Sequence, residues 1–450
     1  MSLQKISLEP FVNYQKIIKM NNYFITNTFT TDKYLYVSYI NDKGYDNPNG
    51  NNMLVQYDIK TEKKNWDYKY KSRLPTALFS TRKYFFMSVV NKLDTTNNSN
   101  EILKLNIKDG KLQEKLNTIE LVLSIFIEND KLYTASSKAI KIYNLNNKLD
   151  EPIENILLNK DIKLKVEQNS YEMNLIIDNN FMYLSYQISQ VNSRMPDKFG
   201  LCKINKYNKK VIWIKRSQRG TDLSEHDIDN LSVLYISNDF IYTNSFNKDL
   251  KYPEDFSSYA IKLDKEKGRI KKIYKYTDEN RNSEYGDVNS GVTSICVKFG
   301  YVFVGATDGI IRIFNEKTGK LLTRLYQYSE NDEVTDIIDI YIINKYLYTS
   351  SDLYVKKWDL NKIPFFKKLY NIERKTIKNL NSSKSLPKLP QEIKNIIAKK
   401  TVFNNNIKIK NTNIRNVKNI SKNINNTKNN NNQSNRSRVS PNRSSVSSRY

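Results

Sequence analysis

Residues 301–320 read YVFVGATDGIIRIFNEKTGK, and this stretch sets the pattern for most of the chain. Two apolar runs, 301–305 and 310–315, flank the dipeptide Asp308-Gly309. That dipeptide suits a two-residue hairpin turn, because glycine accepts a positive φ at no steric cost and aspartate tolerates one. A second turn signal, Thr-Gly-Lys, closes the stretch. The stretch therefore predicts two antiparallel strands bounded by tight turns.

The first apolar run recurs along the chain with an aromatic residue at its centre. These aromatic anchors are Tyr36, Phe86, Tyr133, Tyr183, Tyr242, Phe303 and Tyr348, at intervals of 50, 47, 50, 59, 61 and 45 residues. Around the anchors an apolar strand precedes, a third strand follows, and a more polar fourth strand ends the unit. Seven such units predict an all-β protein, a seven-bladed β-propeller of four-stranded antiparallel blades over residues 23–372.

The repeats resemble those of two propeller families. Trp358-Asp359 closes the third strand of the last unit, which is similar to a WD repeat. Trp66 and Trp213 each follow the end of a third strand by eight residues, as in quinoprotein-like repeats. The resemblance covers roughly residues 20–372 and implies the propeller fold. His226 is the only histidine, so no unit has the Gly-His pair of WD repeats, and the cofactor ligands of quinoprotein enzymes are not recognisable. The resemblance thus implies no family function.

Both ends of the chain differ from the repeats. Residues 1–22 form an N-terminal arm, and its apolar stretch, 11–20, either pairs with the last blade and closes the ring or lies along the protein without a sealing role. Residues 373–450 are rich in Asn, Lys and Ser and should be mostly disordered. Within them, residues 389–400 predict a short amphipathic helix that docks on the propeller or on a partner, rather than an F-box, whose opening the letters LPQEIKNII resemble. The apolar face of this helix comprises Leu389, Ile393, Ile396 and Ile397.

Charge is uneven along the chain. The net charge is +26, but residues 373–450 hold 18 Lys/Arg and 2 Asp/Glu, a net of +16. Residues 1–372 hold 55 basic and 45 acidic residues, a net of +10, so the repeat region is not by itself a strongly basic nucleic-acid binder.

Cysteine usage and hydropathy predict the compartment. Cys202 and Cys296 lie in apolar runs and are expected to be buried free thiols. No signal core and no membrane-length apolar run is present. We expect a monomeric protein of the cytoplasm, with the nucleus or a virion as alternatives.

Connector lengths point to one functional face. Because strands alternate in direction, connectors between second and third strands share a face with those that join blades. The long connectors on this face are 40–52, 91–100, 187–200, 247–258, 218–230 and 277–290. On the opposite face they are short, as at 31–33. Long loops gathered on one face predict a partner-binding surface, and drift in loop length is the alternative.

Two of the long connectors are acidic. Their carboxylates are Asp222, Glu225, Asp227, Asp229, Asp278, Glu279, Glu284 and Asp287. We interpret them as a patch for a basic partner or for this protein's own tail, and solvated loop charges are the alternative. A metal site at Glu225, His226 and Asp227 is not expected, because adjacent residues rarely converge on one ion.

The sequence lacks the common catalytic motifs. It contains no GxSxG, no GxGxxG and no GxxxxGK[ST], and we expect neither an enzyme nor a cofactor. The preferred hypothesis is a non-catalytic protein–protein interaction scaffold. One alternative is a scaffold tethered through its basic tail to nucleic acid or another polyanion. The other is a propeller-type hydrolase, because spacing in sequence does not fix the distance between carboxylates.

Overall fold

The computed structural model describes residues 14–18, 23–41, 52–70, 74–90, 100–166, 173–188, 198–216, 234–248, 256–275, 291–327, 335–363 and 366–367. All but one of them belong to a compact unit that ends at Phe366. The tail, including the predicted docking helix, lies outside the described residues, as do all eight acidic residues of the predicted patch.

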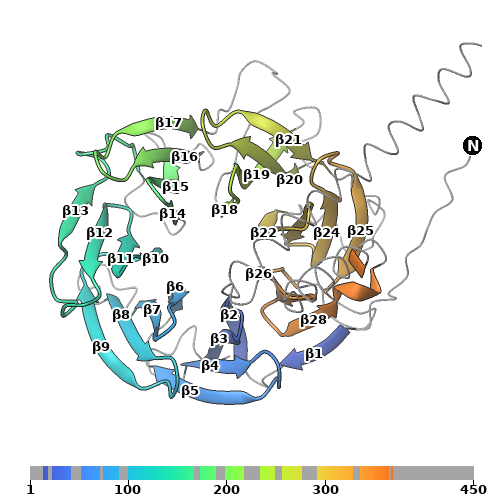
Figure 1. Cartoon of the computed structure of the whole chain (residues 1–450), viewed down its shortest axis with the longest axis horizontal. Coiled ribbons are helices and arrows are strands. Elements are labelled where there is room, and N and C mark those ends of the chain that lie inside the picture. Colours follow the sequence, from blue (N-terminus) through green and yellow to red (C-terminus); the bar gives the residue numbers. More distant parts are fainter. Residues whose placement is uncertain are drawn as a thin grey trace, which may run out of the picture. The chain divides into compact units, whose positions relative to one another are not determined.

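Seven four-stranded antiparallel sheets form the ring of a β-propeller, as predicted (Figure 1). Blade 1 comprises β2 Tyr23–Thr30, β3 Tyr34–Asn41, β4 Asn52–Asp58 and β5 Lys64–Tyr70. Blade 2 comprises β6 Leu74–Ser80, β7 Tyr84–Val90, β8 Asn100–Asn106 and β9 Leu112–Thr118. Blade 3 comprises β10 Ser124–Glu128, β11 Lys131–Ala135, β12 Ala139–Asn144 and β13 Glu154–Leu157. Blade 4 comprises β14 Met173–Asp178, β15 Phe181–Ile188, β16 Lys198–Asn205 and β17 Val211–Arg216. Blade 5 comprises β18 Leu234–Ile236, β19 Phe240–Lys248, β20 Phe256–Asp264 and β21 Ile270–Tyr274. Blade 6 comprises β22 Val292–Lys298, β23 Tyr301–Ala306, β24 Ile310–Asn315 and β25 Leu321–Tyr326. Blade 7 comprises β26 Asp339–Ile343, β27 Tyr346–Ser350, β28 Val355–Asp359 and β1 Tyr14–Ile18. The 3-10 turn η2 Leu360–Lys362 follows β28.

The aromatic anchors occupy equivalent positions in all seven blades. Each lies on a second strand (β3, β7, β11, β15, β19, β23 or β27), and each is at most 3% exposed. In blade 6, Phe303 lies opposite Cys296 on one side and Ile313 on the other. A strand buried on both faces needs apolar residues in succession, which explains why these strands are continuous apolar runs in the sequence.

The core is divided among the blade interfaces. Seven clusters of buried apolar side chains are present, and each joins two neighbouring blades. Six interfaces would suffice for an open row of seven blades. The seventh cluster places Val37 and Tyr39 of blade 1 beside Tyr348 and Val355 of blade 7, so the row closes into a ring.

An N-terminal strand completes the last blade. β1 pairs antiparallel with β28, with Tyr14 opposite Trp358 and Ile18 opposite Val355. The fourth strand of blade 7 therefore comes from the opposite end of the repeat region, and Figure 1 shows β1 beside β28. This pairing covers what would otherwise be the open edge of β28.

The inner strands of blades 7 and 1 are joined by polar side chains. Asp339 accepts hydrogen bonds from the backbone N–H (3.1 Å) and the hydroxyl (2.9 Å) of Thr28. The hydroxyl of Tyr341 donates to the Thr28 carbonyl at 2.6 Å. Burial raises the pKa of Asp339 and outweighs the opposing effect of these hydrogen bonds.

The turns between third and fourth strands share one design. The last residue of the third strand accepts backbone N–H groups of the turn through its side chain; these residues are Asp58, Asn106, Asn205, Asp264 and Asn315. A residue of positive φ then reverses the chain at Glu62, Gly110, Lys209, Gly268 or Gly319. Asn and Asp stabilise such turns because their side chains replace backbone hydrogen-bond partners.

The turn between β23 and β24 differs from the predicted two-residue hairpin. It spans residues 307–309, and of the dipeptide only Gly309 has a positive φ, +68°. The carboxylate of Asp308 accepts the N–H of Ile310 at 3.1 Å and holds the guanidinium of Arg312. The side-chain contacts of Asp308 thus accompany a three-residue loop in which glycine alone takes the left-handed conformation.

Candidate functional site

Strand direction gives the propeller two rims of different construction. The short-turn rim carries the connectors between first and second and between third and fourth strands, which are 2 to 9 residues long. The long-loop rim carries the connectors between second and third strands and between blades, which reach 17 residues at 217–233 and 275–291. The strand bounds therefore attach the six long connectors to one rim.

The two rims also differ in charge. Connectors of the short-turn rim contain 17 Lys/Arg and 9 Asp/Glu, a net of +8. Connectors of the long-loop rim contain 14 Lys/Arg and 25 Asp/Glu, a net of −11. The modest net charge of the repeat region thus conceals a separation of charge between rims, which the linear sequence does not display.

The long-loop rim has an acidic cluster among its described residues. Asp308 follows β23, Asp336 precedes β26 and Asp352 follows β27, so three connectors of blades 6 and 7 contribute. The pKa of Asp336 is raised, first by burial and then by the negative charges of Asp352 and Asp308. Neighbouring negative charges repel one another, and the approach of a cation relieves that repulsion. Sequence reasoning missed this cluster because its members lie in three separate connectors.

The described part of the chain offers no arrangement suited to metal binding: no group of three or more His, Cys, Asp or Glu side chains there could hold an ion. Its two cysteines are buried free thiols, as predicted. Burial raises the pKa of Cys296 to about 11 and that of Cys202 further, so both thiols stay protonated at neutral pH.

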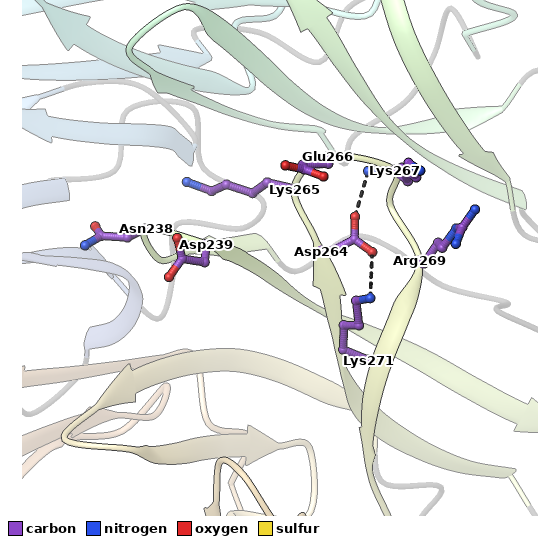
Figure 2. A pocket seen from close by; sticks show the side chains of 8 residues that line it. All are labelled: Asn238, Asp239, Asp264, Lys265, Glu266, Lys267, Arg269 and Lys271. Carbon is purple, nitrogen blue, oxygen red and sulfur yellow. Dashed lines mark hydrogen bonds and ion pairs between the residues drawn. The ribbon is translucent and has the colours of Figure 1, made fainter. Parts of the chain in front are cut away.

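A pocket of about 460 Å³ lies on the short-turn rim of blade 5 (Figure 2). Its lining residues are Asn238, Asp239, Asp264, Lys265, Glu266, Lys267, Arg269 and Lys271. Burial alone would raise the pKa of Asp264, but the N–H of Lys267 at 2.7 Å and the ammonium of Lys271 at 3.5 Å hold it below its usual value. Asp264 is therefore an ionised residue that stabilises the turn, as the dashed contacts in Figure 2 show.

A tryptophan of blade 4 contacts the backbone of the turn that lines this pocket. The indole Nε1 of Trp213 donates to the Lys265 carbonyl at 3.2 Å, and its ring packs on Gly268. The ammonium of Lys265 in turn pairs with Asp178 of blade 4. Among the charged groups of the pocket, Lys265 thus joins blade 5 to blade 4, whereas Asp264 and Lys271 pair within blade 5.

Buried lysines recur beneath the short-turn rim. Lys104, Lys203, Lys262 and Lys357 each lie two residues before the end of a third strand, and each is at most 9% exposed. Their ammonium groups lie 3.6 to 4.7 Å from the ring centres of Tyr84, Phe181, Phe240 and Tyr346, at the starts of the second strands. We call these four residues the buried lysines. Each buried lysine precedes the last residue of its third strand by two positions, and this spacing is a signal that sequence reasoning overlooked.

Three of the buried lysines contact the next blade. Lys203 donates to the Lys265 carbonyl at 2.9 Å, and Lys262 pairs with Glu316 at 2.6 Å. Lys357 of blade 7 pairs with Glu62 of blade 1. A buried charge requires a partner and hydrogen bonds, and these partners come from the adjacent blade. The buried lysines therefore contribute to blade alignment.

Comparisons with known proteins support no family assignment. No protein-family model matches the chain, and no curated protein matches it. Among solved structures, BamB from Moraxella catarrhalis is similar with 11% identity and a TM-score of 0.44, over 77% of this chain and 97% of BamB. The computationally designed Ika8 protein is similar with 12% identity and a TM-score of 0.45, over 77% of this chain and 99% of the designed one. Among the described residues, no helix has the length and apolar character needed to cross a membrane.

Proposed function

We propose that the chain is a non-catalytic interaction scaffold that binds a basic protein segment on its long-loop rim. The observation that supports this proposal is the coincidence of two properties on one rim. The longest connectors attach there, and the same connectors carry 25 acidic against 14 basic residues. Long loops on a rigid scaffold commonly carry binding functions.

Electrostatics favour a basic partner. Burial raises the pKa of Asp336, and the negative charges of Asp352 and Asp308 raise it further. A lysine or arginine of a partner would relieve the repulsion among these carboxylates. The acidic residues predicted from sequence in 217–233 and 275–291 attach to the same rim and would extend the surface past blade 5. Complementary charge accelerates association and selects against acidic partners.

Charge reversal tests this proposal. Partners recovered by affinity capture on the full chain should be bound at least about tenfold less well by the double variant Asp227→Lys/Asp287→Lys at about 0.1 M salt. The matched control is Asp32→Lys/Glu151→Lys, which changes the net charge equally at exposed positions of the short-turn rim. Equal capture by both double variants would contradict the proposal.

A second candidate is a scaffold tethered to nucleic acid or another polyanion through the tail. It rests on the 18 basic and 2 acidic residues of 373–450. In this alternative the tail is the sole contact with nucleic acid, so deleting these residues should abolish retention on nucleic acid and leave capture of the protein partner unchanged. The hydrolase alternative is tested at Asp336, a described carboxylate whose pKa is raised by burial and by its neighbours. Asp336→Asn should abolish any hydrolysis detected.

A further inference from the structure

We infer that the short-turn rim is itself a binding surface for single-stranded nucleic acid, separate from the long-loop rim and from the tail. All thirteen connectors of this rim are among the described residues. Those of blades 4, 5, 6, 7, 1 and 2 contain 16 Lys/Arg and 6 Asp/Glu, a net of +10, and we call them the basic arc. The connectors of blade 3 interrupt the arc, with one lysine and three acidic residues.

Two of the six acidic residues of the arc are paired with lysines beneath the rim and not with its exposed lysines. Glu62 pairs with Lys357 and Glu316 pairs with Lys262, and both of these lysines are buried beneath the rim. The buried lysines thereby neutralise two carboxylates of the arc. Lys63, Lys108 and Lys317 are exposed, and no carboxylate of the described residues lies within ion-pair distance of them. Four other lysines of the arc, Lys206, Lys209, Lys265 and Lys345, are paired with carboxylates of the strands. The positive charge open to a ligand therefore comes mainly from exposed lysines that have no ion-pair partner among the described residues, such as Lys63, Lys108 and Lys317.

Aromatic side chains accompany the lysines around the arc. The ammonium groups of Lys345, Lys33 and Lys83 lie 4.9, 4.9 and 5.0 Å from the ring centres of Tyr346, Tyr34 and Tyr84, on the consecutive blades 7, 1 and 2. In blade 4, Tyr207 is 71% exposed and shares one turn with Lys206, Lys209 and Lys210, of which Lys206 and Lys209 are paired with Glu128 and Glu154. Proteins that bind single strands combine basic residues that follow the phosphates with aromatic rings on which bases stack.

The same rim is poorly suited to a membrane. Interfacial membrane binding requires a contiguous apolar face beside the cations. In the short-turn connectors the large exposed apolar residues are Ile153 and Tyr207, and Ile153 belongs to the acidic blade 3. Phosphate contacts without apolar insertion release counterions from a nucleic acid, which yields affinity that depends steeply on salt.

The experiment compares two triple variants of the full chain in fluorescence-anisotropy titrations with a labelled oligothymidylate. The rim variant is Lys63→Glu/Lys108→Glu/Lys317→Glu. The control variant is Lys138→Glu/Lys160→Glu/Lys165→Glu, which alters exposed lysines in connectors of the long-loop rim by the same net charge. The rim variant should bind about tenfold more weakly at about 0.1 M salt. Its slope of log K against log salt should fall by about 2, because each lost phosphate contact removes about 0.7.

Two further measurements distinguish binding by the rim from binding by the tail, and the contribution of base stacking from that of charge. Lysine acetylation followed by mass spectrometry should show protection of Lys63, Lys108 and Lys317 by the oligonucleotide and none of Lys138 and Lys160. Tyr207→Ala should weaken binding about fivefold with the salt slope unchanged. Equal losses in the two triple variants, or protection confined to tail lysines, would overturn the inference. So would selective loss by the rim variant of binding to vesicles containing phosphatidylserine while its oligothymidylate affinity stays at wild type.

Discussion

The indole Nε1 of Trp66, on the outermost strand of blade 1, donates a 3.0 Å hydrogen bond to the backbone carbonyl of Ile107 in blade 2. The indole ring also covers Gly110, in the same turn as Ile107. Trp213 makes the equivalent contacts to Lys265 and Gly268 between blades 4 and 5. Each tryptophan thus links its blade to the next one at the outer edge of the ring, far from the inner strands.

Trp66 should contribute to stability mainly through packing. Trp66→Ala should lower the free energy of unfolding by about 3–5 kcal/mol, as for other large buried aromatic residues. Trp66→Phe should cost about 1–2 kcal/mol, because the Ile107 carbonyl keeps a second donor, the amide of Gln56 at 2.9 Å. Urea unfolding of the full chain measures both values. Equal losses for the two variants would assign the stability to the hydrogen bond instead.

Gly110 should be less tolerant of a side chain than Gly300. Both have positive φ, +70° and +77°, so Gly→Ala costs each about 1–2 kcal/mol in backbone strain. A Cβ at Gly110 would lie 2.6 Å from Trp66, whereas none of the described atoms lies within 4 Å of one at Gly300. Gly110→Ala should therefore lower the thermal midpoint further than Gly300→Ala. The excess should vanish in a Trp66→Ala background, and an excess that persists there would contradict the steric explanation.

Glu316 should be the critical partner of the buried Lys262. Its carboxylate accepts hydrogen bonds from Lys262 at 2.6 Å and from the hydroxyl of Tyr242 at 2.7 Å. Glu316→Gln leaves the lysine buried without a counter-charge and should cost about 2–3 kcal/mol in unfolding free energy. Glu266→Gln, at an exposed position of the neighbouring turn, is the control and should be neutral. Adding Lys262→Met to Glu316→Gln should recover part of the loss.

Closure between blades 7 and 1 should depend on pH through Asp339. Its pKa is raised in the folded state, so the folded protein binds this proton more tightly than the unfolded chain, whose value is near 3.8. The stabilisation from protonated Asp339 is present at low pH and is lost as pH rises from about 3.8 through the folded pKa.

The variant Asp339→Asn isolates this contribution, because it keeps an oxygen that can accept from Thr28. The difference in unfolding free energy between variant and wild type should shift in favour of the variant as pH rises across that range. Thermal unfolding at a series of pH values measures the difference. A difference independent of pH would show that Asp339 does not titrate in this range.

Much of the fold follows from local pattern. Phe303 and its six counterparts mark the second strand of every blade, because those strands are buried on both faces and must be apolar in succession. Strand bounds could also be predicted within a few residues wherever Asx turns end the third strands, as at Asn315. The hairpin loop before Ile310 was predicted one residue too short, because the bonds that Asp308 makes to Ile310 and Arg312 are invisible in a dipeptide.

The candidate site was predicted only in outline. The acidic residues from Asp222 to Asp287 were proposed from connector length and composition, and they lie outside the described residues, so they stay a prediction. The cluster of Asp308, Asp336 and Asp352 was missed, because its members come from three connectors. The basic arc was missed for the same reason: turns with only two or three cations each form one surface once six blades lie side by side.

By itself, the sequence determined the number of blades, the strands that are buried, and the alternation of short and long connectors, because these depend on residues close together in the chain. Only the tertiary structure decided that β1 completes blade 7, that buried lysines find their partners in the next blade, and that opposite charges collect on opposite rims. Each of these depends on which distant segments become neighbours, and strand direction and ring closure determine that choice.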